Sequence, residues 1–286
     1  MKLIGKILLS ALALTIATML AGVIASALPL SPPIPLPGES PSLPSMLFGS
    51  LVLVVGLVPI ASSLGGRFVT RWLALGLMLY VATGVNTVVE LVIFGTQGGH
   101  WYLLAFYFLC FVATAAALAW QYDSQQSAPQ LPRLGTGQWV WRLAVAWLSF
   151  PVIYFLFGLC VAPFVIPIYQ AGVVGLRIPL DVIMRTQLLR SFLFLASSLP
   201  VILLWTRSRR RLSSLLDGLT RPWLVSTACP RPPYMPPVLR VLHSLEIAGD
   251  SFVYALILVW LFFPRERIGT ASTVLGTTVS TTPSVA

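Results

Sequence analysis

The residues best suited to chemistry lie in the stretch HSLEIAGDSFVYALILVW, residues 243–260. His243, Glu246 and Asp250 are spaced so that a helix would place their side chains on one face. The rest of the stretch is apolar enough to enter a membrane. Because an acid inside a membrane costs about 2.5–3.5 kcal/mol on insertion scales, this face should meet protein or water. The stretch therefore predicts a polar site in the wall of a membrane helix.

A second polar face is predicted in WLALGLMLYVATGVNTVVELVIF, residues 72–94, where Tyr80, Asn86 and Glu90 would share one side. Glu90 is the only charged residue inside this run. If the chain crosses the membrane eight times, the acids of both stretches and Arg190 gather near the outer side. The candidate residues for binding a substrate or ion are Glu90, Asn86, Glu246, Asp250, His243 and Arg190.

Two other interpretations of these residues stay open. Pairs such as Glu90 with Arg190, or Asp250 with Arg185, would also neutralise charge and fix helix register, often for only ~0.6 kcal/mol per contact. An H-x-x-E spacing offers two metal ligands, but carboxylate-bridged di-metal sites repeat Glu-x-x-His on two helices. No HExxH, GxSxG or Walker motif is present. We therefore predict no catalytic residue, no metal and no cofactor.

Composition places the chain in a membrane. Of its residues 57% are hydrophobic and 9% are charged, against roughly 25% charged in soluble domains. Apolar runs of membrane-spanning length recur throughout, which predicts an all-α, polytopic transmembrane bundle. Seven spans are clear, at 7–25, 46–64, 72–94, 101–120, 140–166, 187–205 and 241–263. An eighth, at 212–229, is marginal because Asp217 and Arg221 lie inside it.

The order of the runs predicts two parallel four-helix pseudo-repeats, each with arginines after its second run, RFVTR at 67–71 and RSRRR at 207–211. We expect an N-terminal half at 1–120, a polar linker at 121–138, a C-terminal half at 139–263 and a disordered Ser/Thr-rich tail at 264–286. An equal helix count in both halves favours about eight helices.

The net charge of +10 lies in short basic clusters between apolar runs. This distribution predicts a cytoplasmic N-terminus in a plasma (inner) membrane, and no nucleic-acid binding. Arg207, Arg209, Arg210 and Arg211 are expected to meet anionic lipid headgroups. Residues 1–27 also fit a cleaved signal peptide, although their apolar run is longer than a typical signal core.

Two features of the second half carry further expectations. Pro151, Pro163 and Pro167 predict a kinked helix, or a discontinuous one of the kind that lines transport sites. The alternation of apolar and charged residues over 170–190 predicts a short helix on the outer membrane surface.

The leading functional hypothesis is a transporter or channel-like protein for a small polar solute or ion, with an acidic site between two helical halves. One alternative is a structural or assembly subunit, whose polar faces bind a helix of another membrane subunit. A less favoured alternative is an intramembrane enzyme that uses His243, Glu246 and Asp250.

Overall fold

The computed structural model describes residues 3–32, 42–93, 99–122, 134–170, 179–206 and 237–263, and these ranges contain helices and no strand. The elements are α1 (Leu3–Ala27), α2 (Leu43–Ala61), α3 (Phe68–Leu79), the π-helix η1 (Tyr80–Val85), α4 (Asn86–Ile93), α5 (His100–Gln121), α6 (Thr136–Gln170), α7 (Leu180–Leu203) and α9 (Pro237–Phe262). The predicted all-α fold is confirmed.

Seven segments of the described chain are long and apolar enough to cross a membrane. They coincide with the seven predicted spans, and α3, η1 and α4 together form one of them. Helices are the expected form because backbone N–H and C=O groups in lipid must find partners within their own segment. The predicted marginal span at 212–229 lies outside the described residues, as does the tail at 264–286.

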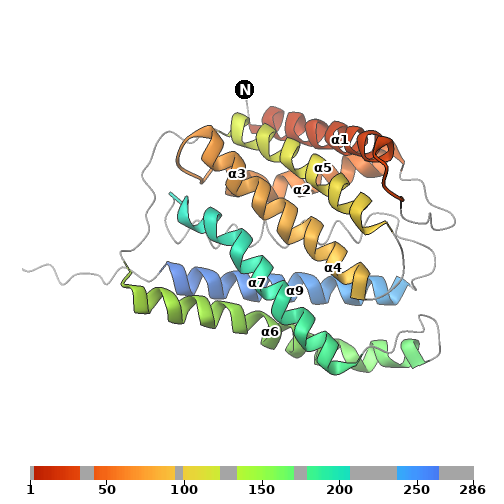
Figure 1. Ribbon diagram of the computed structural model, residues 1–286, viewed down its shortest axis with the longest axis vertical. Coiled ribbons are helices and arrows are strands. Elements are labelled where there is room, and N and C mark those ends of the chain that lie inside the picture. Colours follow the sequence, from red (N-terminus) through yellow and green to blue (C-terminus); the bar gives the residue numbers. More distant parts are fainter. Residues whose placement is uncertain are drawn as a thin grey trace, which may run out of the picture.

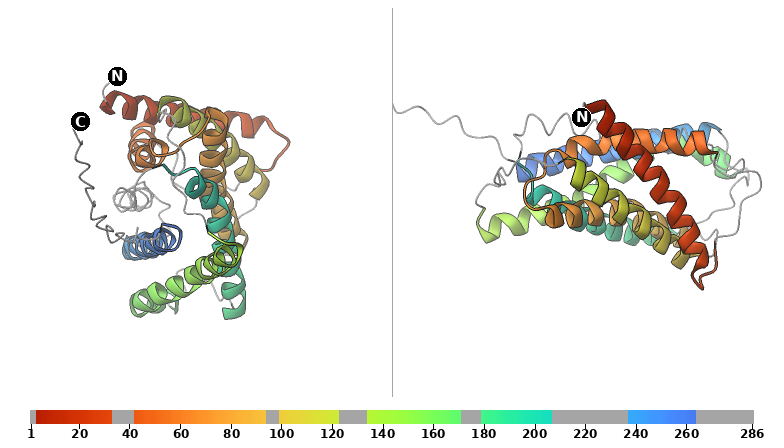
Figure 2. Two further views of the ribbon diagram at one scale, coloured as in Figure 1. Left: turned by 90° about the vertical axis from the view of Figure 1, so that its left-hand side faces the viewer. Right: turned by 90° about the horizontal axis from the view of Figure 1, so that it is seen from above.

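The helices form two groups that meet along α3, α4 and α7. In the first group, α1 packs on α2 and α5, and α5 packs on α3; in the second group, α6 packs on α7 and α9. Helix α7 crosses over to contact α3, η1 and α4, and so joins the two groups (Figure 1). Seen end-on, α1 and α6 lie at opposite edges of the molecule (Figure 2).

Helices α7 and α9 run in the same direction, because both are antiparallel to α6 (Figure 1). Glu90 is near the end of α4, whereas Glu246 and Asp250 are near the middle of α9. This arrangement allows the acids of both groups to approach one another, away from the end of the bundle where α2 and α7 finish.

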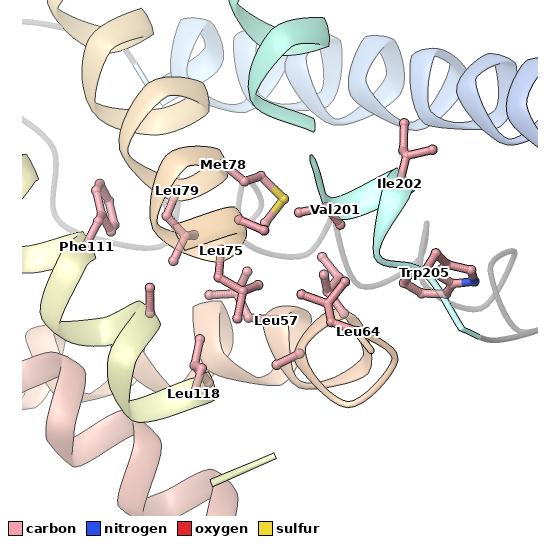
Figure 3. Packing of buried hydrophobic residues seen from close by; sticks show 14 of the residues in the cluster. Leu57, Leu64, Leu75, Met78, Leu79, Phe111, Leu118, Val201, Ile202 and Trp205 are labelled. Atoms are coloured by element: carbon pink, nitrogen blue, oxygen red, sulfur yellow. The ribbon is translucent and has the colours of Figure 1, made fainter. Parts of the chain in front are cut away.

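The apolar core is densest at the opposite end, where α2, α3, α5 and α7 meet (Figure 3). Leu64, Leu75 and Leu118 are fully buried there, and Trp205 packs beside them. Because lipid tails are as apolar as these side chains, the contacts stabilise the bundle through van der Waals packing rather than through removal from water. An isolated antiparallel bridge joins Leu64 to Trp205, so α2 and α7 are attached where each helix finishes. This attachment holds α7 against the third span.

The third span is not a uniform helix. A π-turn places one extra residue in the turn and rotates the residues after it, which changes the face that later side chains occupy. The Tyr80 ring meets Phe108 of α5 at a centroid distance of 5.4 Å, whereas Glu90 faces α7. The predicted single face for Tyr80 and Glu90 is therefore wrong, because it assumed a regular period of 3.6 residues.

Two expectations for the second half are also corrected. Helix α6 runs from Thr136 to Gln170 without interruption and contains Pro151, Pro163 and Pro167, so it is not a discontinuous helix. Residues from Leu180 onward belong to α7 rather than to a separate surface helix. Leu180 follows Pro179, whose missing N–H and fixed φ suit a helix start.

Gly84 should be required for the contact between η1 and α5, because an added Cβ would lie 2.7 Å from Tyr107 Cβ. This atom adjoins the backbone and cannot move away easily. We expect Gly84→Ala to destabilise the protein by about 1–3 kcal/mol through overpacking, seen as a lower thermal midpoint in lipid nanodiscs. The control is Gly137→Ala in α6, where nothing lies within 4 Å and alanine should be neutral or stabilising. Equal effects of the two substitutions would contradict this account.

Candidate functional site

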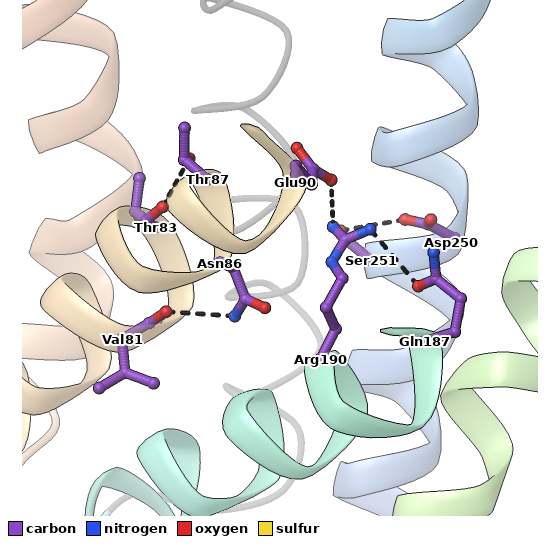
Figure 4. Close-up of polar contacts among 9 residues, drawn as sticks. All are labelled: Val81, Thr83, Asn86, Thr87, Glu90, Gln187, Arg190, Asp250 and Ser251. Carbon is purple, nitrogen blue, oxygen red and sulfur yellow. Dashed lines mark hydrogen bonds and ion pairs between the residues drawn. The ribbon is translucent and has the colours of Figure 1, made fainter. Parts of the chain in front are cut away.

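The first component of the site is the polar turn that follows η1. Asn86 is 2% exposed, and its Nδ2 donates to the Val81 carbonyl oxygen at 3.1 Å. Its Oδ1 is buried and has no hydrogen-bond partner. Glu90 lies one turn later on α4, and its side chain is 33% exposed. The π-turn directs both residues toward α7 (Figure 4).

The second component is Arg190, which reaches from α7 to α4. Its Nη2 lies 2.6 Å from Glu90 Oε1, so an ion pair joins the two helix groups. Its Nη1 donates to Gln187 Oε1 at 3.4 Å, one turn earlier on α7. The Arg190 side chain is only 10% exposed. A charge-assisted pair of this kind is stronger than an exposed one because water screens it less.

The third component is the acidic face of α9. Glu246 and Asp250 are both buried, at 8% and 4% exposure. Asp250 accepts a hydrogen bond from Ser251 Oγ at 3.2 Å. Gly158 of α6 lies beside Glu246, where an added Cβ would be 3.6 Å from the carboxylate oxygen Oε1. Glycine at this position therefore leaves room next to the acid.

The three components form one electrostatic cluster. Tyr154 of α6 interacts electrostatically with Glu90, Arg190, Glu246 and Asp250 at the same time. Figure 4 shows the Arg190 guanidinium between Glu90 on one side and Asp250 on the other. We call these four charged residues the charged cluster. Acids remote in sequence therefore lie around one arginine inside the bundle.

Other predicted partners lie elsewhere. Arg185 pairs with Asp181 at 3.8 Å on the exposed start of α7, with side chains 83% and 63% exposed, and not with Asp250 as one alternative expected. The side chain of His243 and the residues Arg207–Arg211 lie outside what the structure describes. Within the described ranges, no group of three or more His, Cys, Asp or Glu side chains could hold a metal ion.

Two residues of the site were missed by the sequence analysis. Gln187 lies three positions before Arg190, a spacing that places both on one helix face and that the sequence contains. Tyr154 is surrounded by aromatic and aliphatic residues in α6, and no pattern distinguishes it there. Only the packing of α6 against α9 brings it to the acids.

With seven apolar helices in its described ranges and a charged cluster between them, the chain is a polytopic integral membrane protein. It matches no known family model, no curated protein sequence and no solved structure. The chemistry of the site indicates the ligands that it suits. Glu90 and Asp250 lie on either side of one guanidinium, so this part of the cluster is suited to a cation or a proton.

The Glu90–Arg190 pair should contribute more to stability than the exposed Asp181–Arg185 pair. In a double-mutant cycle with Glu90→Gln and Arg190→Gln, we expect an interaction free energy of about 1–3 kcal/mol. The same cycle with Asp181→Asn and Arg185→Gln should give about 0.5 kcal/mol or less, because both side chains are solvated. Equilibrium unfolding in mixed detergent micelles measures both values. Similar values for the two pairs would show that Arg190 is not held by Glu90.

Proposed function

We propose that this membrane protein is a transporter or channel-like protein for a small polar solute or ion. The observation that best supports the proposal is the Glu90–Arg190 ion pair, which crosses the contact between the two helix groups beside Glu246 and Asp250. Alternating access requires a site between two bodies that can move relative to each other, near the middle of the bundle. A charged cluster at such a contact is suited to this task.

Equivalent contacts in the two helix groups support parallel repeats over 1–120 and 139–263. In the first group, Lys6 Nζ of α1 donates to the Gln121 carbonyl oxygen at the end of α5, at 2.8 Å. In the second group, Arg142 Nη1 of α6 donates to the Leu261 carbonyl oxygen at the end of α9. Each first helix thus provides a cation for the carbonyls left free at the negative end of the last helix.

The ends of α2 and α7 support the same division. Each helix has a proline in its last turn, Pro59 or Pro200, and the interval from Pro59 to Leu64 equals that from Pro200 to Trp205. Leu64 and Trp205 are the two residues of the antiparallel bridge. An antiparallel bridge has local two-fold symmetry, so pairing of equivalent residues fits a pseudo-two-fold axis along the membrane normal.

Alignment by these contacts pairs Gly22 with Gly158 and Phe106 with Glu246. A Cβ added at Gly22 would lie 4.0 Å from the Phe106 ring, just as one at Gly158 would lie 3.6 Å from Glu246. The two glycines therefore occupy corresponding places between the first and last helix of each group.

The first group makes this contact without charge. Phe106 occupies the position of Glu246, and Cys110 occupies the position of Asp250. Packing of α6 on α9 therefore does not require acids, since the corresponding pair packs with uncharged side chains, including a hydrogen bond between Thr18 and Cys110. We assign Glu246 and Asp250 to the transport task rather than to holding the helices together.

Orientation is part of the proposal. Lys6 and Arg142 lie at the end of the bundle where α2 and α7 finish, near Arg71, which donates to the Tyr122 carbonyl oxygen at 3.0 Å. We place this basic end in the cytoplasm of a cell with the protein in its plasma (inner) membrane. Arg207–Arg211 would then meet anionic lipid on the same side.

Transport is tested with purified protein in proteoliposomes. We expect transient currents on a solid-supported membrane for some members of a panel of cationic, neutral and anionic solutes. Glu246→Gln and Glu90→Gln should reduce these currents at least tenfold, because each substitution replaces a carboxylate of the charged cluster by a neutral amide. The matched control is Asp181→Asn, which removes an exposed acid outside the charged cluster. Full currents in both cluster variants would reject the proposed site.

Orientation is tested by labelling single cysteines in a cysteine-free background. Trp101 at the start of α5 is 75% exposed, and Phe68 at the start of α3 lies at the opposite end of the bundle. In intact cells, Trp101→Cys should react with a membrane-impermeant maleimide, and Phe68→Cys should react only after lysis. The reverse pattern would place the basic end outside.

A further inference from the structure

The charged cluster accepts more hydrogen bonds than it donates. Glu90 and Asp250 lie on either side of Arg190 and provide carboxylate oxygens to this one cation (Figure 4). Surplus negative charge is costly away from water and favours a bound positive group. The ligand that complements this site is therefore a cation.

Asn86 adds an acceptor that nothing fills. Its side chain is almost wholly buried, its Nδ2 is used by the Val81 carbonyl oxygen, and its Oδ1 has no partner. Figure 4 shows this oxygen on the side of α4 that faces Arg190. An amide oxygen accepts hydrogen bonds and cannot donate them. A ligand with N–H or O–H donors would therefore complete the site.

Arg190 uses only some of its N–H donors to bind the acceptors of the site. A guanidinium has five N–H donors, and here the short contact is the one to Glu90 at 2.6 Å. The bond to Gln187 is long, at 3.4 Å, and the buried Nε has no partner. Arg190 is thus a resident cation held mainly by one carboxylate, with a second acid, Asp250, on its other side (Figure 4).

We propose that the site binds a small organic cation with a primary ammonium or guanidinium group, which takes the place of Arg190 at Glu90. This inference rests on the proposed transport function and names its substrate class. The N–H donors of the ligand satisfy Glu90 and Asn86, and Arg190 turns to the carboxylates of α9. Glu90 and Asp250 then each have a cation of their own, while the ion pair between the two helix groups is broken.

Other cations fit the site less well. A divalent metal needs several carboxylate or imidazole ligands, and the described part of the chain holds no group of three that could supply them. A quaternary ammonium ion brings charge without N–H donors, so the Asn86 oxygen would remain without a hydrogen bond. An alkali ion could be coordinated by this oxygen, but it needs several more oxygen ligands to replace its hydration shell.

Binding is tested with the full chain in lipid nanodiscs, using ethylammonium, ethylguanidinium, tetramethylammonium and sodium chlorides at one ionic strength. Titration of the thermal midpoint gives the dissociation constant for each ion. We expect ethylammonium and ethylguanidinium to raise the midpoint of the wild type, with little effect of tetramethylammonium and sodium. Asp181→Asn should behave as the wild type, and Glu90→Gln should show no shift.

Substitution of Arg190 is the most decisive part of the experiment. The proposal expects it to strengthen ligand binding, whereas a simple loss of structure would weaken binding. Arg190→Gln removes the resident competitor, so ethylguanidinium should bind at least tenfold more tightly than to the wild type. Arg190→Lys keeps a tethered cation and should stay close to the wild type. If the Arg190→Gln protein accumulates in cells only when ethylguanidinium is added to the medium, this rescue also supports the exchange of Arg190 for the ligand at Glu90.

Equal shifts by sodium or tetramethylammonium, or weaker binding in Arg190→Gln, would overturn the proposal. Its failure is distinct from failure of the transport function. Currents for other solutes without any shift by the organic cations would reject only the ligand class. Tight ethylguanidinium binding without currents for any solute would reject transport and leave the binding site.

Discussion

The arrangement of this protein depends on the cost of charge in a medium of low dielectric constant. The 2.6 Å pair between Glu90 and Arg190 shows how that cost is met. Neither side chain has a favourable position in hydrocarbon alone, and each lies on a helix of a different group. The pair is consequently a constraint on how the two groups sit together. Asp250 lies on the other side of the same guanidinium (Figure 4).

Two features of the fold bring Glu90 and Arg190 together. At one end, the bridge between Leu64 and Trp205 and the apolar core around it attach α7 to α2 and α3. At the other end, η1 rotates α4 so that Glu90 faces α7 instead of α5. A π-turn within a membrane span often marks a functional position, because it changes the side-chain register at the price of a weaker hydrogen-bond ladder. Here the register change occurs directly before Asn86.

The two helix groups share contacts at the ends of their helices but differ in the charge of the side chains between those ends. Lys6 and Arg142 bind the ends of their respective last helices in the same manner, and Gly22 and Gly158 adjoin those helices at corresponding places. Between these points, the first group makes its contact without charged side chains, whereas the second group has acids. The first group therefore shows that this kind of packing does not require acids. The acids of α9 exceed that requirement, which agrees with the proposed role in transport.

The sequence by itself determined the class of protein and the seven spans, because apolar runs of bilayer length have few other stable uses in a folded chain. It also identified Glu90, Asn86, Arg190, Glu246 and Asp250, since charged and amide side chains are conspicuous in apolar runs. It did not predict η1, because the local pattern fits a regular helix, and the close approach of Gly84 to Tyr107 within η1 is a contact between segments remote in sequence. Likewise, only the tertiary structure decided that Glu90 pairs with Arg190, that Arg185 stays with Asp181, and that Tyr154 joins the acids. Periodicity specifies which face of a helix a residue occupies, whereas the neighbour of that face is chosen by packing between helices remote in sequence.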